Sequence, residues 1–165
     1  MHLDRGWIER NIPHRGRMCL LDEIIEWDAQ HVRCRSGTHR AADNPLRSQG
    51  RLGAACGIEY AAQAMAVHGA LAAGARARAM AGAGTGGITI GEAPPAAGFL
   101  AGLRDVQLQV LRFDDMQADL ICDALLLAGD GRTALYEFAV ACGAQPLVRG
   151  RATVVFDANQ RLKHE

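Results

Sequence analysis

A carboxylate, an amide and an imidazole lie within one nearly apolar stretch of the chain, and they are its first candidates for chemistry. The stretch runs from Gly53 to Leu71 and contains Glu59, Gln63 and His68. In a helix, Glu59 and Gln63 share a face because they are four residues apart. His68 follows Glu59 by nine residues and falls on roughly the opposite side. Glu59 and His68 therefore cannot form a catalytic pair within one helix.

The stretch is about long enough to cross a bilayer, but its composition predicts a buried helix in a soluble protein. Ala and Gly dominate it, whereas a lipid-facing helix prefers Leu, Ile and Val, and polar groups inside a lone membrane segment are costly. Small residues let a sheet wrap closely around a helix. We expect His68 to be a core or interface histidine. For Glu59, burial raises the pKa and the helix dipole lowers it, so the sequence leaves the sign of the net shift open.

Length and composition predict a single globular domain over residues 1–165, with 49% hydrophobic and 22% charged residues. Eighteen basic and eighteen acidic residues cancel, and no basic, aromatic-interleaved block predicts nucleic-acid binding. The N-terminus lacks the pattern of a signal peptide. Five cysteines without C-x-x-C spacing predict reduced thiols in the cytoplasm. No clustered Cys/His spacing predicts a zinc site.

The remaining sequence predicts mostly strands. Residues 3–11 are typical of a short amphipathic helix, and alternation or apolar runs predict strands at 18–27, 30–36, 99–110, 117–126, 133–142 and 147–156. Gly129-Asp130-Gly131 predicts a hairpin turn. The letters of G-x-G-x-x-G occur at 82–87, but a helix precedes them and a strand at 88–90 follows, so a loop is expected there. One sheet around one helix is an α+β arrangement.

Two segments resemble the β-hydroxyacyl-acyl carrier protein dehydratases, a family with the hot-dog fold. Residues 12–28, IPHRGRMCLLDEIIEWD, are similar to the family's opening, where a Pro-His-Arg turn leads into a hydrophobic strand. Residues 58–69, IEYAAQAMAVHG, are similar to its central helix, in which a Glu is followed four residues later by a Gln. The loop HRAADNPLR at 39–47 most resembles the dehydratase-like proteins of aryl-polyene biosynthesis.

The resemblance implies a hot-dog dimer whose two sheets join, with active sites at the interface. It implies removal of water from a 3-hydroxyacyl chain on an acyl carrier protein or a coenzyme A thioester, with no metal or redox cofactor. In the family a histidine takes the α-proton, an acid on the central helix helps the hydroxyl leave, and backbone N–H groups polarise the carbonyl. Carried over, Glu59 is the acid, Gln63 supports it, and Gly53 and Gly57 lie where the backbone donors are expected.

The family's catalytic histidine does not carry over. Counting back from Glu59 places residues 44–47, NPLR, where the family has Gly-His-Phe-Pro, so Pro45 occupies the place of the histidine. His39 lies earlier in the same loop and is the candidate base, while His14 matches a family position that is not the usual base. Three functions stay open: a dehydratase using His39 and Glu59, a non-catalytic partner of an active hot-dog subunit, and a thioesterase. The assembly is equally open between a homodimer and a heterodimer with a related subunit.

Overall fold

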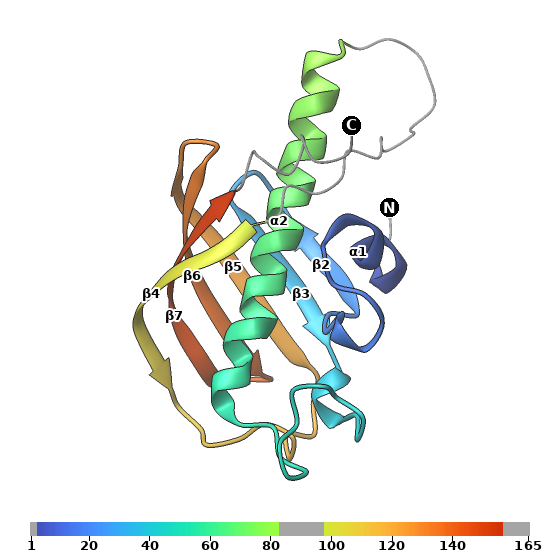
Figure 1. Cartoon of the computed structure of the whole chain (residues 1–165), viewed down its shortest axis with the longest axis vertical. Helices are drawn as coiled ribbons and strands as arrows, with labels where there is room; N and C mark the ends of the chain where they lie inside the picture. The colour runs from blue at the N-terminus through green and yellow to red at the C-terminus, as the bar shows by residue number, and fades with distance from the viewer. Residues whose placement is uncertain (1–2, 83–97, 157–165) are drawn as a thin grey trace, which may run out of the picture.

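A seven-stranded antiparallel sheet wraps one long helix in the computed structural model, which describes residues 3–82 and 98–156 (Figure 1). The long helix is α2, Gly57–Met80, and a short helix, α1, spans Arg5–Asn11. The strands are β1 (Leu3–Asp4), β2 (Glu23–Trp27), β3 (His31–Ser36), β4 (Gly98–Leu108), β5 (Leu120–Gly129), β6 (Thr133–Cys142) and β7 (Gln145–Phe156). Short 3-10 helices occupy Gly16–Met18, Thr38–Arg40 and Ala54–Cys56. The predicted arrangement of one sheet around one helix is confirmed.

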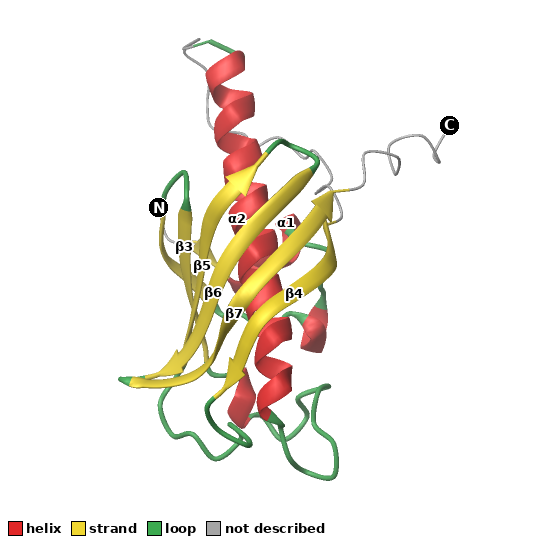
Figure 2. Cartoon of the chain, turned by 90° about the vertical axis from the view of Figure 1, so that its left-hand side faces the viewer, coloured by secondary structure: helices red, strands yellow, loops and turns green. Residues whose placement is uncertain are grey.

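The strand order leaves β1 and β4 at the two edges of the sheet. The order is β1-β2-β3-β5-β6-β7-β4, and β4 pairs only with β7 although it follows α2 directly among the described elements. Strands from both described ranges join where β3 pairs with β5. Figure 2 shows the sheet curving around one side of α2, with the last turns of the helix projecting beyond the strands. One face of the helix therefore packs on the sheet.

Small residues let α2 approach the sheet closely. A Cβ atom at Gly57 would lie 2.8 Å from Val148 Cγ2 and 3.1 Å from Phe113 Cζ, so glycine is needed where the helix begins. Ala61 and Ala64, further along the same helix, are fully buried. The helix continues beyond Leu71, where the most apolar stretch ends, to Met80.

Two predicted elements at the start of the chain differ from the structure. The strand predicted from residue 18 begins only at Glu23, because both backbone groups of Leu20 bond to side chains instead of a neighbouring strand. Leu3 and Asp4, predicted as helix, pair with β2 as β1. Asp4 then caps α1, with its Oδ1 accepting a hydrogen bond from Trp7 N at 3.0 Å.

The second half of the chain follows the prediction more closely, except at β4. Gly131 has a φ of 87°, and Asp130 Oδ1 accepts hydrogen bonds from two turn N–H groups, which confirms the predicted hairpin turn. The strand predicted at 99–110 forms β4, but its residues are almost all exposed instead of alternating. The pattern fails because β4 is an edge strand. Of the predicted loop at 82–87 and strand at 88–90, only Gly82 lies within the described residues.

The described residues contain neither a membrane-spanning helix nor a cluster of metal-ligating side chains. Within residues 3–82 and 98–156, no helix has the length and apolar character needed to span a membrane. The same residues hold no group of three metal-ligating side chains.

The five cysteines are free thiols, and Cys34 lies opposite Cys122 across β3 and β5. Burial raises the pKa of Cys34 to about 12, so this thiol is unsuited to act as a nucleophile.

Candidate functional site

Glu59 and Gln63 share a face of α2, and the structure brings His14 to them. His14 Nε2 lies 3.1 Å from Glu59 Oε1, and Gln63 Nε2 donates a hydrogen bond to the same oxygen at 3.1 Å. The side chains of His14 and Glu59 are 27% and 34% exposed, so a small molecule can approach them. His14 therefore belongs to the site directly, and the only sequence signal for it is the Pro-His-Arg turn.

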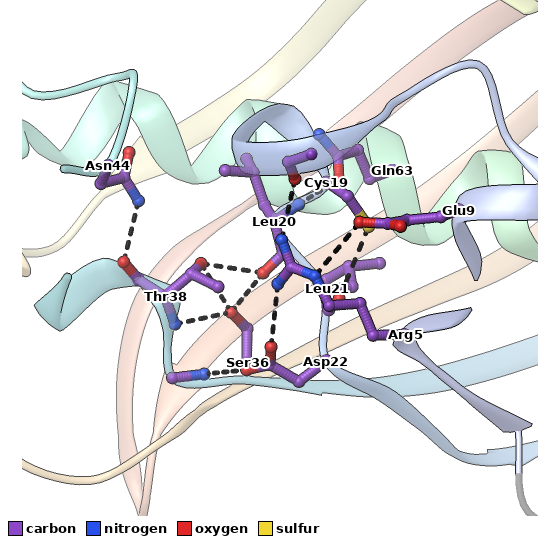
Figure 3. A network of polar contacts seen from close by, with 12 residues as sticks. Arg5, Glu9, Cys19, Leu20, Leu21, Asp22, Ser36, Thr38, Asn44 and Gln63 are labelled. Carbon is purple, nitrogen blue, oxygen red and sulfur yellow. Dashed lines mark hydrogen bonds and ion pairs between the residues drawn. The ribbon is translucent and has the colours of Figure 1, made fainter. Parts of the chain in front are cut away.

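Gln63 holds the segment that carries His14 against the helix that carries Glu59. Its side chain is fully buried, its Oε1 accepts from Leu20 N at 2.8 Å, and its Nε2 also donates to Met18 O at 2.8 Å. The backbone carbonyl of Leu20 is also held by hydrogen bonds, from side chains on the other side of the segment (Figure 3). The Leu20 carbonyl accepts from Ser36 Oγ at 2.5 Å and from Thr38 Oγ1 at 2.8 Å. These bonds fix the approach of the segment to α2.

A second buried network fixes the loop in front of α2. Asn44 Nδ2 donates to Thr38 O and to the Tyr60 hydroxyl, both at 3.0 Å, and the hydroxyls of Thr38 and Tyr60 lie 2.9 Å apart. Asn44 is buried while the adjacent Pro45 is exposed. Pro45, which the sequence predicts to occupy the place of the family's histidine, thus lies at the surface and has no titratable group.

Glu59 is ionised at neutral pH in this environment. Burial raises its pKa, but hydrogen bonds from His14 and Gln63 outweigh burial, and the pKa falls below its usual 4.5. A carboxylate only accepts hydrogen bonds, so His14 Nε2 carries a hydrogen. The other ring nitrogen, Nδ1, is buried and has no hydrogen-bond partner among the described residues. A neutral imidazole oriented by a carboxylate in this way keeps one basic nitrogen.

A cavity of 970 Å³ opens beside Glu59 and His14. It extends along α2 and is lined mainly by apolar residues of both helices and of the sheet, including Trp7, Met65, Leu71, Phe99, Leu126 and Phe156. Its size suits a small-molecule or acyl ligand. The arrangement places one acid–base pair at the wall of an apolar cavity.

His39 does not reach this cavity in the structure. The 3-10 helix Thr38–Arg40 turns the imidazole into the core, where it is fully buried and its Nε2 bonds to Met116 O at 3.0 Å. Arg47 Nη2 donates to the His39 carbonyl at 3.1 Å and holds the same turn. Burial lowers the pKa of His39. The predicted pairing of His39 with Glu59 is therefore absent within one chain.

The two glycines at the start of the helix have different environments. The N–H of Gly57 bonds to the carbonyls of Ala54 and Ala55, so it is not free to polarise a substrate carbonyl. Gly57 instead faces the sheet, as described above. Gly53 is exposed, with no atom within 4 Å of the position of its missing Cβ. Gly53 stays a predicted backbone donor, although neither glycine lines the cavity.

The sheet, the central helix with its acid, and the cavity beside it define a protein of the hot-dog class. Comparison with known families identifies the family within this class to which the chain belongs. A family model described as ApeP-like, ApeP dehydratase, matches residues 7–163. The chain belongs to this ApeP-like dehydratase family.

Solved structures agree with this assignment. The dehydratase heterocomplex ApeI:P from Xenorhabdus doucetiae matches with 27% identity and a TM-score of 0.72, over 94% of this chain and 93% of that chain. AziG of S. sahachiroi (11% identity, TM-score 0.51, 81% and 88% covered) and a mutant thioesterase from Pseudomonas aeruginosa (11%, 0.50, 82% and 81%) are similar in fold alone. No curated protein sequence matches the chain.

Proposed function

We propose that this chain removes water from a 3-hydroxyacyl thioester held on an acyl carrier protein, acting as one subunit of a hot-dog dimer. The observation that carries the proposal is the contact of His14 with Glu59 at the wall of the apolar cavity. Membership of the ApeP-like dehydratase family supports it. An acyl chain fits the apolar lining, and its thioester end fits the acid–base pair.

In the proposed reaction a shift of the His14 side chain exposes Nδ1, which is buried in the structure, and Nδ1 takes the proton from the α-carbon. The electrons of that C–H bond form the double bond to the β-carbon, and the C–O bond of the 3-hydroxyl breaks. The imidazolium, stabilised by the carboxylate of Glu59, returns the proton to the departing oxygen, and water leaves. Gln63 keeps the carboxylate in place. Positioned acid–base groups of this kind contribute about 10²- to 10⁴-fold to a rate.

The proposed partner is a related hot-dog subunit. Among residues 3–82 and 98–156, strand β4 pairs on one side only, and it exposes large apolar side chains, with Phe99 at 52% and Leu108 at 49% exposed. Open apolar edges are normally covered in natural proteins. The most similar structure described above is a heterocomplex. These observations support a heterodimer joined through β4.

A non-catalytic role is the second candidate, and Pro45 favours it. The exposed loop position next to Asn44 holds a proline where the family has its histidine. In this alternative the partner subunit supplies the base, and the chain described here stabilises that subunit and shapes its cavity.

The deciding experiment measures loss of water from a 3-hydroxyacyl carrier protein by mass spectrometry, with the chain alone and with its partner subunit. Glu59→Gln should lower the rate about 10²-fold or more while the chain stays folded, with only a small fall in melting temperature from the lost carboxylate. Glu26→Gln is the matched control, because Glu26 is 57% exposed and lies outside the cavity. Full activity of Glu59→Gln in the complex would instead establish the non-catalytic role, and release of free acid would establish a thioesterase.

A further inference from the structure

Two buried polar side chains line the cavity at a distance from Glu59. His68 and Tyr136 are 1% and 2% exposed, and both contribute to the cavity wall. Their rings meet edge to face, with centroids 5.6 Å apart and planes at 85°. His68 lies nine residues beyond Glu59, which corresponds to about 13.5 Å along the helix axis. Burying polar groups in an apolar environment costs free energy unless they are hydrogen-bonded, so the partners of these two side chains are informative.

The hydrogen bonds of this pair have one consistent direction. His68 Nε2 lies 3.3 Å from Asp28 O, and a carbonyl only accepts, so Nε2 carries the hydrogen. Burial lowers the pKa of His68, which keeps the ring neutral and leaves Nδ1 as an acceptor. Nδ1 then accepts a hydrogen bond from the Tyr136 hydroxyl at 2.9 Å. The Tyr136 oxygen has no other hydrogen to give, but it can still accept.

The charges nearby restrict what that oxygen can accept from. Arg76, two helical turns after His68, also lines the cavity, and its charge acts on Tyr136. Burial outweighs this effect and raises the pKa of Tyr136 to about 12, so the phenol stays neutral. A ligand ammonium would be repelled by Arg76, and a carboxylate, although Arg76 would attract it, has no hydrogen to donate to the Tyr136 oxygen. A neutral hydrogen-bond donor, such as a hydroxyl, suits the site.

The cavity connects this pair with Glu59 along the helix. Ala62 and Ala66 line it between Glu59 and His68, and Gly69, Ala72 and Ala73 line it beyond His68. These small side chains leave room for a chain to pass around α2. A ligand that places its thioester near Glu59 can therefore place its far end near Tyr136.

We propose that His68 and Tyr136 form a recognition site for the distal end of the acyl chain, and that they select chains ending in a hydroxyl over chains ending in a methyl group. This inference rests on the proposed function only in assuming that the cavity holds an acyl chain. Tyr136 accepts the ligand hydrogen bond, and His68 orients the tyrosine. The preference is decided far from the reacting atoms, so it is separate from catalysis.

The test measures binding instead of turnover, by titration calorimetry on the purified protein in the assembly it forms. The probes are saturated acids of eight, ten, twelve and fourteen carbons, each paired with the same acid bearing a terminal hydroxyl. At the length that reaches Tyr136, the hydroxylated acid should bind about 2- to 10-fold more tightly, as one neutral hydrogen bond contributes. Tyr136→Phe should remove this difference while leaving the affinity for the unmodified acid unchanged.

Tyr60→Phe is the matched control. The Tyr60 hydroxyl is also buried and hydrogen-bonded, but Tyr60 does not line the cavity. The preference should persist in that variant. Equal affinity for both acids at every length, a preference that survives Tyr136→Phe, or no binding of either acid would overturn the inference. A failure of the proposed function is seen separately, as absence of dehydration by a complex that still discriminates the two acids.

Discussion

At the scale of single residues, the charge of Glu59 determines which roles its neighbours can take. Hydrogen bonds from His14 and Gln63 keep the carboxylate ionised despite its burial. An ionised carboxylate has no proton to donate, so it serves to orient an imidazole and to stabilise its charge. The proton for the leaving hydroxyl is therefore assigned to His14.

Substitutions of His14 and of His39 should affect different properties, the first catalysis and the second stability. His14→Ala should lower the dehydration rate about 10²-fold or more, because it removes the base, without changing the free energy of unfolding beyond about 0.5 kcal/mol. His39→Ala should lower that free energy by about 1–3 kcal/mol, because it leaves the Met116 carbonyl without its buried donor. Steady-state rates and urea unfolding of both variants check this. Loss of activity in a stable His39→Ala protein would return the role of base to His39.

At the scale of elements, the close packing of α2 on the sheet positions the site. The helix is set by Gly57 at its start and by the bonds of Gln63 to Met18 and Leu20. A change at the sheet side of the helix therefore also displaces Glu59. The projecting part of α2 is under no such constraint.

Two alanine substitutions in α2 should act in opposite directions. Gly57→Ala should destabilise the protein by about 1–3 kcal/mol, because the new Cβ meets the buried side chains of Val148 and Phe113. Gly74→Ala should stabilise it by about 0.4–1 kcal/mol, because no described atom outside the adjoining helix backbone lies within 4 Å of the new group and alanine favours the helix. Chemical unfolding of the two variants measures the difference. Equal effects would show that close packing at Gly57 is not required.

At the scale of the whole molecule, β4 is the surface on which assembly depends. Leu103→Glu on β4 should weaken the dimer about 10-fold or more. Leu103 is exposed in the single chain, and a leucine that becomes buried in an interface contributes roughly 1.5–3 kcal/mol. Leu127→Glu on β5, at a similarly exposed leucine away from the edge, is the control and should leave the dimer intact. Sedimentation velocity of both variants decides the matter. Two unaffected variants would place the interface elsewhere.

The buried histidines should make the stability of the molecule depend on pH. Burial lowers the pKa of both His39 and His68 from the usual 6.5, so the unfolded chain binds protons that the folded chain excludes. The free energy of unfolding should therefore be greatest above pH 6.5 and fall as the pH decreases from that value through the folded-state pKa values. Urea unfolding between about pH 7.5 and 5.5 measures this slope. His68→Gln should flatten it, and an unchanged slope in that variant would exclude His68 as a cause.

Glu59 contributes a second change in stability at lower pH. Its pKa is lowered in the folded state, so its contribution is present above the usual value of 4.5 and is lost as the pH falls below that value. The two effects therefore occupy different pH ranges. Comparison of the wild-type chain with Glu59→Gln below pH 4.5 isolates the carboxylate.

The sequence by itself predicted most of the elements and the position of the Glu59 carboxylate. Local periodicity predicted the central helix and most strands, and the four-residue spacing of Glu59 and Gln63 placed them on one face, because helix geometry fixes such neighbours. It also predicted that Pro45 occupies the place of the family's histidine. These features depend on residues close together in the chain.

Only the tertiary structure decided which histidine meets Glu59. His14 reaches it because Gln63, Ser36 and Thr38 hold the backbone of Leu20, and these contacts join residues distant in sequence. The same contacts delay the start of β2, which periodicity cannot reveal. The exposure of β4 likewise depends on its place at the sheet edge. Local patterns specify neighbours along an element, whereas long-range hydrogen bonds and strand order decide which elements face one another.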